Sequence, residues 1–548
     1  MKKWRYNLIF ILIILFGAAI ISRLVYIQIV RHDLYMAWAQ GQQKIFQPVK
    51  GERGKIFFKD GEILATNLKT KYLFVSPYEV EEKEKTAQEL SQILGLEKEG
   101  ILAKLEKDSL FEKIKADLTE EKEKLIRELN LSGVYIKEAL FRNYPQEYMA
   151  SQIVGFLGGE ENGQYGIEGY YDDLLQGKEL IRKSDTIQGS YNGSDVFLTL
   201  DYNIQFMSEK LLKKAKQDLD IEGGEIIVLD PRTGRIIALA NFPNFNPNNY
   251  SEIEDFEIFQ NGAIQKLYEP GSSFKPITMA AAIDQGKVTP QTAYIDKGKI
   301  KIGEYTIENY NGRVFGEKTM TEVLENSINT GAVFAESQLG HDLFLNYIES
   351  FGFFEPTDID LQGEVFSENK IFKRGYEINF ATASFGQGIG ITPIQLARAF
   401  TAIANEGRLV KPYIVEKIVT NGEEKKTLPE ISSEQVISSK TASQLTAMLI
   451  SVVENGFAKA AKVSGYYLAG KTGTAQIPWS VLGVDKKGYS GKTWQSFIGF
   501  GPAFNPRFLI LVKLDNPKAR TAEYSALPIF KELAKYIIDY YKIPPDYE

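Results

Sequence analysis

A serine and a lysine stand three residues apart where an apolar stretch of the chain begins. The chain breaks at Pro270 and Gly271, continues through Ser272, Ser273 and Lys275, and is mostly apolar over residues 277–283. This pattern predicts a helix whose first residues are Ser272 and Ser273. The positive end of a helix favours a developing oxyanion, and residues three apart share a helix face, so the Lys275 ammonium can reach the Ser272 hydroxyl. A serine nucleophile needs a nearby base, and lysine is one when burial or another cation lowers its pKa.

The composition leaves few other candidates for the base. The 548 residues include no cysteine and only two histidines, His32 and His341. Thiolate nucleophiles, disulfides and cysteine-based zinc sites are therefore excluded, and neither a metal site nor a cofactor is predicted. The net charge of −7 gives no indication of the basic face that a nucleic-acid partner would require. A Ser-Lys pair is the natural alternative to a histidine-based triad.

The Ser-x-x-Lys spacing alone does not identify a nucleophile. It recurs at Ser367 and Lys370, in a polar stretch without an apolar helix behind it, which predicts a surface loop. For Ser272 alone, an N-terminal helix cap beside a solvated lysine explains the spacing equally well.

Two later segments carry matching chemistry. Ser327 and Asn329 place a hydroxyl and an amide two residues apart, where they could relay a proton and hold a peptide amide. The same spacing at Ser190 and Asn192 shows that a helix cap or a turn is the alternative. The segment that contains Lys471, Thr472, Gly473 and Thr474 combines a cation with hydroxyls, which suits a substrate carboxylate at a strand edge. Gly473 would let another backbone come close, although an ordinary edge strand with a solvated lysine also fits.

Residues 465–472 match the formal pattern of a phosphate-binding loop. That loop requires a strand before it and a helix after it. Residues 466–469 are instead typical of a strand, and residues 474–478 cannot begin a good helix. We therefore reject nucleotide binding.

The N-terminus has the pattern of a membrane anchor. Lys2, Lys3 and Arg5 precede an apolar run over residues 6–22, and the apolar pattern continues beyond it. We expect residues 1–40 to form a single-pass anchor and a juxtamembrane helix, with the N-terminus inside and the bulk of the chain outside the cytoplasmic membrane. A cleavable signal peptide is the alternative, because residues 17–19 are small, although apolar residues follow them.

The rest of the chain predicts an α+β protein of more than one domain. Residues 53–64 have the strand, turn, strand pattern of a hairpin. Residues 79–130 are charged, with Leu90 and Leu94 at helical spacing and, less regularly, Leu102, Leu105 and Leu110. The polar residues 184–194 indicate a linker.

Beyond the linker, strands are predicted at both ends of the remaining chain. They cover residues 224–229 and 235–240, then 496–501 and 508–514, and an amphipathic helix over 527–541 closes the chain. Helical patterns dominate between residues 271 and 456. We therefore expect an antiparallel sheet built from both ends of the domain and sandwiched by helices.

Taken together and in this order, the three motifs resemble the S-x-x-K, S-x-N and K-T-G set of penicillin-binding proteins and serine β-lactamases. Their surroundings are similar to class B penicillin-binding proteins over nearly the whole chain, most weakly across residues 80–140. The segments that carry this resemblance are 268–275, 385–389, 471–476, 53–56, 60–65, 142–145 and 166–169.

The resemblance implies a domain organisation and a reaction. Residues 41–190 would form an elongated pedestal or dimerisation-type domain with a helical head at about 80–140, and residues 195–548 would form the transpeptidase domain. Ser272 would attack the penultimate carbonyl of a D-alanyl-D-alanine stem peptide of peptidoglycan, expel the terminal D-alanine and pass the acyl group to an amine of a neighbouring strand. β-Lactams would acylate the same serine.

The resemblance also implies a role for each motif residue. Lys275 would be the base for acylation, and Ser327 would relay a proton. Asn329 would hold the donor peptide, and the carboxylate would contact Lys471, Thr472 and Thr474 beside Gly473. The backbone N–H groups of Ser272 and Thr474 would form the oxyanion hole.

The resemblance leaves the cellular role open between cell division and elongation. Thr472 and residues 384–388 look more like the division branch, but the C-terminal repeat modules of some division enzymes are not evident. The implied partner is a polytopic membrane glycosyltransferase within a division or elongation complex. The alternative functions are a D,D-carboxypeptidase or β-lactamase, in which water resolves the acyl-enzyme, and a non-catalytic β-lactam sensor or scaffold.

Overall fold

The computed structural model describes residues 3–26, 28, 48–159, 161–181 and 192–547. By its contacts the chain divides into two units, residues 1–53 with 176–193 and residues 54–175 with 194–548. The predicted continuation of the N-terminal helix to residue 40 and most of the predicted linker at 184–194 lie outside the described residues.

The first unit contains the predicted apolar helix. Helix α1 (Lys3–Val25) extends beyond the predicted run of residues 6–22 at both ends. Its window Leu8–Val25 is long and apolar enough to cross a membrane, by length and composition, and no other helix in the described residues passes that test. The same unit holds an antiparallel pair of short strands, β1 (Pro48–Lys50) and β8 (Glu179–Ile181).

The second unit is built around a five-stranded antiparallel sheet with the order β11-β10-β20-β19-β18. Its strands are β10 (Gly223–Leu229), β11 (Ile236–Phe242), β18 (Ala469–Pro478), β19 (Tyr489–Gly501) and β20 (Phe508–Asp515). The four predicted strands and their origin at both ends of the domain are confirmed. Strand β18 forms one edge of the sheet, so Lys471 and its neighbours lie on an edge strand, as predicted.

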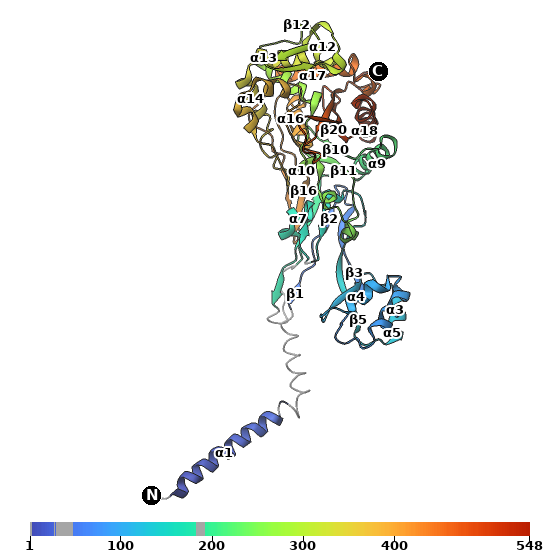
Figure 1. Ribbon diagram of the computed structural model, residues 1–548, viewed down its shortest axis with the longest axis vertical. Coiled ribbons are helices and arrows are strands. Elements are labelled where there is room, and N and C mark those ends of the chain that lie inside the picture. The colour runs from blue at the N-terminus through green and yellow to red at the C-terminus, as the bar shows by residue number, and fades with distance from the viewer. Residues whose placement is uncertain (1–2, 27, 29–47, 160, 182–191, 548) are drawn as a thin grey trace. The chain divides into compact units, whose positions relative to one another are not determined.

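Helices cover both faces of this sheet (Figure 1). Helices α9 (Tyr202–Leu219) and α18 (Ala526–Tyr540) pack on one face, and α18 is the predicted closing helix. Helices α10 (Gly262–Gln265) and α16 (Pro393–Ala404) pack on the other face, and α17 (Ser439–Glu454) contacts β18. The predicted sheet sandwiched by helices is therefore confirmed.

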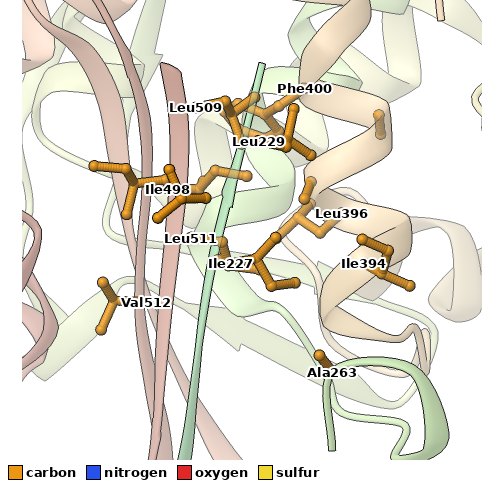
Figure 2. Packing of buried hydrophobic residues seen from close by; sticks show 14 of the residues in the cluster. Ile227, Leu229, Ala263, Ile394, Leu396, Phe400, Ile498, Leu509, Leu511 and Val512 are labelled. Carbon is orange, nitrogen blue, oxygen red and sulfur yellow. The ribbon is translucent and has the colours of Figure 1, made fainter. Parts of the chain in front are cut away.

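The face toward α16 is filled with aliphatic side chains (Figure 2). Ile227, Leu511 and Ile498 lie side by side on three adjacent strands, and Leu396 and Phe400 of α16 pack against this face. All five side chains are completely buried, so each is stabilised by removal of its apolar surface from water. This packing holds the central strands in a fixed position, and the edge strand with them.

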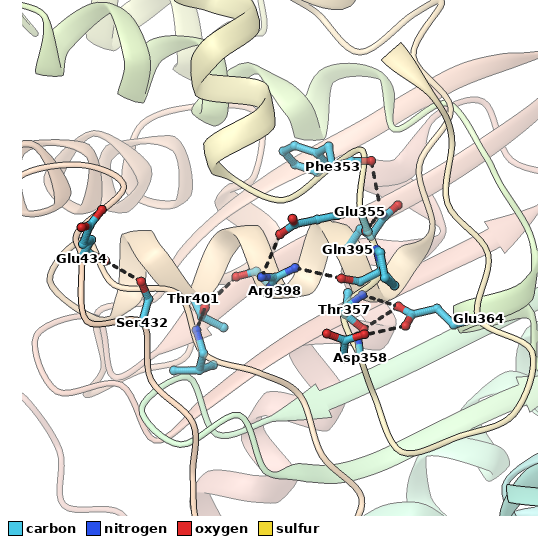
Figure 3. A network of polar contacts seen from close by, with 12 residues as sticks. Phe353, Glu355, Thr357, Asp358, Glu364, Gln395, Arg398, Thr401, Ser432 and Glu434 are labelled. Carbon is cyan, nitrogen blue, oxygen red and sulfur yellow. Dashed lines mark hydrogen bonds and ion pairs between the residues drawn. The ribbon is translucent and has the colours of Figure 1, made fainter. Parts of the chain in front are cut away.

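Polar contacts fix the loop that runs beside α16 (Figure 3). The Gln395 amide donates hydrogen bonds to the carbonyl oxygens of Phe353 and Glu355, at 3.1 and 2.8 Å. The Arg398 guanidinium pairs with the Glu355 carboxylate at 3.3 Å. Because buried amides and carbonyls must find partners, these bonds select one conformation of the loop.

A second sheet of seven strands joins distant parts of this unit. Strand β2 (Ile56–Phe57) pairs antiparallel with β3 (Ile63–Val75), which confirms the predicted hairpin, and parallel with β9 (Asp195–Leu198). Strand β9 also pairs with β16 (Val415–Thr420), and β16 pairs with β17 (Glu423–Lys426).

The region from residue 83 to residue 143 packs a group of helices on the far end of β3. Strand β3 pairs there with β4 (Glu112–Lys115) and β5 (Val134–Asn143). Helices α3 (Lys83–Leu94), α4 (Lys98–Leu105) and α5 (Glu120–Leu129) surround a separate small core.

The leucine spacing in this region was only partly informative. Leu90, Leu94 and Leu105 are buried in the small core, as the helical spacing predicts. The inclusion of Leu110 in that pattern is wrong, because α4 ends at Leu105 and the Leu110 side chain is 68% exposed.

The remaining elements lie in the second unit. They include α6 (Ser151–Val154), α7 (Gly166–Tyr170), α8 (Asp172–Leu175), β12 (Ala293–Asp296), β13 (Lys299–Ile302), β14 (Tyr305–Glu308), β15 (Gly316–Thr319), α14 (His341–Ser350) and α15 (Glu377–Ala383).

A buried ion pair links β5 to α7. The Arg142 guanidinium contacts the Glu168 carboxylate at 2.6 Å, and both side chains are almost fully buried. Arg142 also donates to the Gly54 carbonyl at 2.8 Å and to the Asn67 amide oxygen at 3.1 Å. The Arg142 guanidinium therefore links the segments that contain Gly54, Asn67 and Glu168.

We expect Glu168→Gln to destabilise the protein strongly. The substitution leaves the Arg142 cation buried without its carboxylate, and breaking a buried pair in this way costs about 3–5 kcal/mol. Thermal denaturation followed by circular dichroism measures the effect. The matched control is Glu138→Gln, which removes the exposed carboxylate that pairs with Lys69 at 2.8 Å and should leave the melting temperature nearly unchanged. Equal melting temperatures for both variants would contradict the expectation.

Candidate functional site

Ser272 lies in a tight turn directly before a buried helix. The turn is the 3-10 segment η4 (Gly271–Phe274), and the α-helix α11 (Lys275–Asp284) continues from it. The predicted helix therefore begins at Gly271, one residue before Ser272, and its first turn has 3-10 geometry. Short 3-10 segments are common at helix N-termini, where the first N–H groups have no α-helical partner. Here the Ser273 hydroxyl donates to the Pro270 carbonyl at 2.7 Å and tightens the turn.

Two glycines bring this turn against strand β18. A Cβ atom on Gly473 would lie 2.6 Å from the Pro270 carbonyl oxygen and 2.5 Å from the Ser496 hydroxyl oxygen. A Cβ atom on Gly271, whose φ is +56°, would lie 2.9 Å from the Thr474 carbonyl oxygen. Only residues without a side chain allow this approach. It places Ser272 beside the edge strand that carries Lys471 and Thr474.

The segment that precedes α16 supports the turn from another side. The Gly271 N–H donates to the Gly386 carbonyl at 2.9 Å, and the Thr278 hydroxyl donates to the Ser384 carbonyl at 2.8 Å. Gly386 has φ of +79°, and a Cβ atom there would lie 2.1 Å from the Gly271 carbonyl oxygen. Gly386 therefore allows this segment to pack against the turn.

Ser327 lies between two helices near Lys275, and Asn329 is the first residue of the second helix. Helix α12 (Met320–Glu325) ends before Ser327, and α13 (Asn329–Leu339) begins at Asn329. The Lys275 ammonium donates to the Ser327 carbonyl at 2.6 Å, to the Asn329 amide oxygen at 2.8 Å and to the Ser327 hydroxyl at 3.3 Å. Ser327 has φ of +52°, a conformation that non-glycine residues adopt at a cost and that is common at functional sites.

A second ammonium reaches the same hydroxyl from the edge strand. Lys471 Nζ lies 3.0 Å from Ser327 Oγ, 3.2 Å from the Thr472 carbonyl oxygen and 3.3 Å from Thr472 Oγ1. The three motifs, which are about 50 and 140 residues apart in the chain, therefore meet at Ser327.

Burial changes the acid–base chemistry of both lysines. Lys275 and Lys471 are each only 1% exposed. Desolvation, and then the charge of Lys471, lowers the pKa of Lys275 well below its ordinary value. Desolvation lowers the pKa of Lys471 to about 8, while Glu523 acts in the opposite direction. A lysine with a lowered pKa reaches its neutral, basic form near neutral pH, which general-base catalysis requires.

The Ser272 side chain is half-buried, and its hydroxyl has no hydrogen-bond partner within the described ranges. The hydrogen bonds of the Lys275 ammonium go to Ser327 and Asn329 instead. Ser272 is thus accessible to a substrate, one turn from a buried amine, and beside a strand edge that carries a cation and hydroxyls.

The Thr474 hydroxyl accepts a hydrogen bond from the Ala522 N–H at 3.3 Å, which ties the edge strand to η8 (Ala522–Tyr524). Two residues earlier, the Arg520 guanidinium donates to the Tyr310 hydroxyl at 3.4 Å. At the start of α13, the Asn329 amide donates to the Glu308 carbonyl at 3.0 Å.

The contact between Arg520 and Tyr310 was not predicted from the sequence. The two residues are 210 positions apart, and a contact over that separation has no local signal.

The second Ser-x-x-Lys pattern and the formal phosphate-loop pattern do not form comparable sites. Ser367 donates its hydroxyl to the Gly390 carbonyl at 2.6 Å, and the exposed Lys370 pairs with Glu368. Strand β18 continues to Pro478, so no helix follows the formal phosphate-loop pattern. The strand begins at Ala469, however, so the prediction that residues 466–468 are also strand is wrong. Among the described residues, no cluster of three or more histidine or carboxylate side chains could hold a metal ion.

Comparison with known proteins identifies the family of this chain. Residues 224–535 match the family model "Penicillin binding protein transpeptidase domain", and residues 48–189 match "Penicillin-binding Protein dimerisation domain". The chain is 34% identical to stage V sporulation protein D of Bacillus subtilis over 538 residues, covering 94% of this chain and 82% of that protein. It is 28% identical to the probable peptidoglycan D,D-transpeptidase PbpC of Pseudomonas aeruginosa, covering 100% of this chain and 96% of that protein.

A solved structure of a penicillin-binding protein has a similar fold. Penicillin-binding protein 3 of Mycobacterium tuberculosis, complexed with ampicillin, superposes with a TM-score of 0.73 at 25% identity, covering 91% of this chain and 97% of that one. The transpeptidase model covers more than half of the 548 residues, and the dimerisation model covers most of the region before it. The chain therefore belongs to the class B penicillin-binding proteins.

Proposed function

We propose that this class B penicillin-binding protein is a peptidoglycan D,D-transpeptidase in which Ser272 is the nucleophile. Relatives from Pseudomonas aeruginosa and Neisseria meningitidis bear the name of that activity. One observation supports this assignment most strongly. The Ser327 hydroxyl lies within 3.3 Å of the buried ammonium groups of Lys275 and Lys471, and Lys275 directly follows the turn that contains Ser272. Stem peptides are the substrates, and β-lactams acylate the same serine.

In the first half-reaction, Ser272 Oγ forms a bond to the penultimate carbonyl carbon of the donor peptide. Neutral Lys275 accepts the hydroxyl proton, and the lowered pKa of Lys275 supports this role. When the tetrahedral intermediate collapses, the bond to the terminal D-alanine nitrogen breaks. The Ser327 hydroxyl, between the two lysines, relays a proton to that leaving nitrogen. An amine of a second strand then attacks the ester and releases Ser272.

The other motif residues hold the donor peptide. The Asn329 amide binds a peptide amide of the donor. Lys471, Thr472 and Thr474 bind the terminal carboxylate, since a cation and two hydroxyls are complementary to it. The N–H groups of Ser272 and Thr474 stabilise the oxyanion, and the close approach allowed by Gly271 and Gly473 supports this pairing.

We also propose a domain organisation and a cellular location that fit this function. Residues 1–40 are the anchor, with the N-terminus inside, residues 41–190 are the pedestal, and residues 195–548 are the extracytoplasmic transpeptidase domain. A polytopic membrane glycosyltransferase that supplies glycan strands is the proposed partner, within a division or elongation complex. The apolar helix α1 supports the membrane anchor.

The rival functions differ in their products. A D,D-carboxypeptidase or β-lactamase would release D-alanine, or hydrolysed antibiotic, without forming peptide dimers. A non-catalytic sensor would bind β-lactam and turn over no peptide. Incubation with polymerised lipid-linked substrate, followed by muramidase digestion and mass spectrometry of dimeric muropeptides, distinguishes the three.

We expect Ser272→Ala to abolish covalent labelling by penicillin. The fold should be retained, because the hydroxyl is accessible and makes no hydrogen bond within the described residues. Intact-protein mass spectrometry after penicillin treatment measures the adduct. Ser367→Ala, at the decoy spacing, should label normally. Labelling that survives in the first variant and disappears in the second would reverse the assignment.

We expect Lys275→Ala to slow acylation by about 10²–10⁴-fold, the usual effect of losing a general base. Stopped-flow measurement with a fluorescent penicillin gives the second-order rate constant. Lys370→Ala, which removes an exposed ammonium paired with Glu368, is the control and should leave the rate unchanged. Equal rates for the two variants would remove Lys275 from the mechanism.

The acylation rate should pass through a maximum as pH rises. At low pH Lys275 is protonated and cannot accept a proton, so the rate rises with pH as the amine becomes neutral. Lys471 is cationic below its pKa of about 8 and loses its charge above it, so binding of the antibiotic carboxylate should weaken there. The second-order rate constant against pH tests both limbs. A rate that stays constant from pH 8 to high pH would contradict the role of Lys471.

A further inference from the structure

An aromatic pocket lies in the second unit, apart from the motif residues. It has a volume of about 480 Å³, within the usual range of small-molecule sites, and none of the motif residues lines it. One wall comes from the hairpin β6 (Phe156–Leu157) and β7 (Gly163–Gln164). The other comes from the 3-10 segments η2 (Pro247–Glu252) and η3 (Phe256–Phe259), which follow β11.

The base of the pocket is rigid. The Phe156 and Tyr250 rings stack at 4.4 Å with 12° between their planes, and Phe156 lies 4.8 Å from the buried Phe259. Tyr144 links the two walls. Its N–H donates to the Asn248 amide oxygen of η2 at 3.0 Å and its carbonyl accepts from the Asn248 amide at 2.9 Å, while its hydroxyl accepts from the Leu157 N–H of β6 at 2.8 Å. The pocket is therefore formed before any ligand arrives.

One aromatic ring is left in water at the rim. Phe256 is 68% exposed, although its ring centroid lies only 6.0 Å from that of Phe259. Single exposed apolar side chains are common, but this ring continues a buried aromatic group up to the opening of a cavity. A ligand with a flat apolar face could cover it.

The charges around the pocket narrow the chemistry of the ligand. The lining side chains carry no charge, and Asn162, Gln164 and Ser251 supply amide and hydroxyl groups. Five exposed residues next to the lining in sequence are acidic, namely Glu161, Glu252, Glu254, Asp255 and Glu257, and of these Glu257 pairs with Lys266 at 3.6 Å. Carboxylates in that number disfavour stem-peptide carboxylates and phosphates. A neutral ligand with an apolar face and hydrogen-bonding edges suits the uncharged lining.

A pyranose ring with hydroxyl and acetamido groups has that combination. Its C–H face can cover an aromatic ring, whose π face is electron-rich, and its edges can bond amides and hydroxyls. We propose that this pocket binds the N-acetylated hexosamine backbone of the glycan strand, an assignment that rests on the proposed transpeptidase function. Because the substrate is a polymer, a second attachment point raises the effective concentration of stem peptides at Ser272.

The test uses the full-length chain in detergent micelles and the neutral β-1,4 tetramer of N-acetylglucosamine. Saturation-transfer NMR titrations give the affinity. Phe256→Ala should weaken binding about tenfold, the effect of losing one aromatic stacking contact. The matched control is Phe206→Ala, which removes another exposed phenylalanine, 53% exposed on α9 and outside the pocket lining, and should bind the tetramer like the unmodified chain.

Penicillin acylation of each protein separates the two proposals. We expect equal acylation rates in the unmodified chain and both variants, because the pocket shares no residue with the motifs. Equal affinity of both variants for the tetramer, or no binding by the unmodified chain, would overturn the glycan site. So would binding of a lysine-rich peptide in place of the sugar, since the acidic rim would then be the determinant. If the unmodified chain binds the tetramer but is not acylated by penicillin, the transpeptidase proposal is contradicted and the sugar site is still supported.

Discussion

The site depends on two lysine ammonium groups that are kept out of water around one serine hydroxyl. Removing a cation from water is costly unless carbonyl, amide and hydroxyl oxygens replace the lost hydration. Ser327 and Asn329 supply such oxygens to Lys275, and Ser327 and Thr472 supply them to Lys471. Neither lysine has a carboxylate within ion-pair distance in the described residues, so desolvation dominates and lowers both pKa values. Helices and the sheet must hold these groups together against mutual repulsion, and the aliphatic core between β10, β20 and α16 provides that rigidity.

The position of Ser272, the proposed nucleophile, follows from backbone contacts. Gly473 on the edge strand and Gly271 in the turn each occupy a place where a methyl group would collide with a carbonyl oxygen. Along the sheet from Gly473 lie Ser496, Lys513 and Glu225, on successive strands. Lys513 pairs with Glu225 at 3.0 Å, and its ammonium lies over the Tyr268 ring, two residues before Pro270. The turn therefore lies against a buried ion pair, which limits its movement.

Much of the fold was predictable because it has local signals. The strands of residues 223–242 and 489–515 are apolar runs separated by turn residues, and the closing helix is amphipathic. The spacing of the motifs also indicated which residues meet, but not which atoms form the contacts. Tertiary packing determines the hydrogen bonds around Ser327, the 3-10 turn at Ser272 and the contact between Arg520 and Tyr310. Leu110 shows the opposite failure, in which a periodic pattern continues past the end of its helix.

Histidine would not serve easily in the place of Lys275. A lysine donates up to three hydrogen bonds from one atom, so a single ammonium can contact the Ser327 carbonyl, the Ser327 hydroxyl and the Asn329 amide oxygen together. An imidazole would offer at most two nitrogens in fixed directions. Lys471 then has two effects, because its charge both suits a carboxylate and helps to deprotonate Lys275. When a substrate carboxylate approaches Lys471, part of that repulsion is neutralised and the pKa of Lys275 rises. In the proposed mechanism, the protonation state of Lys275 is therefore coupled to the binding of a carboxylate at Lys471.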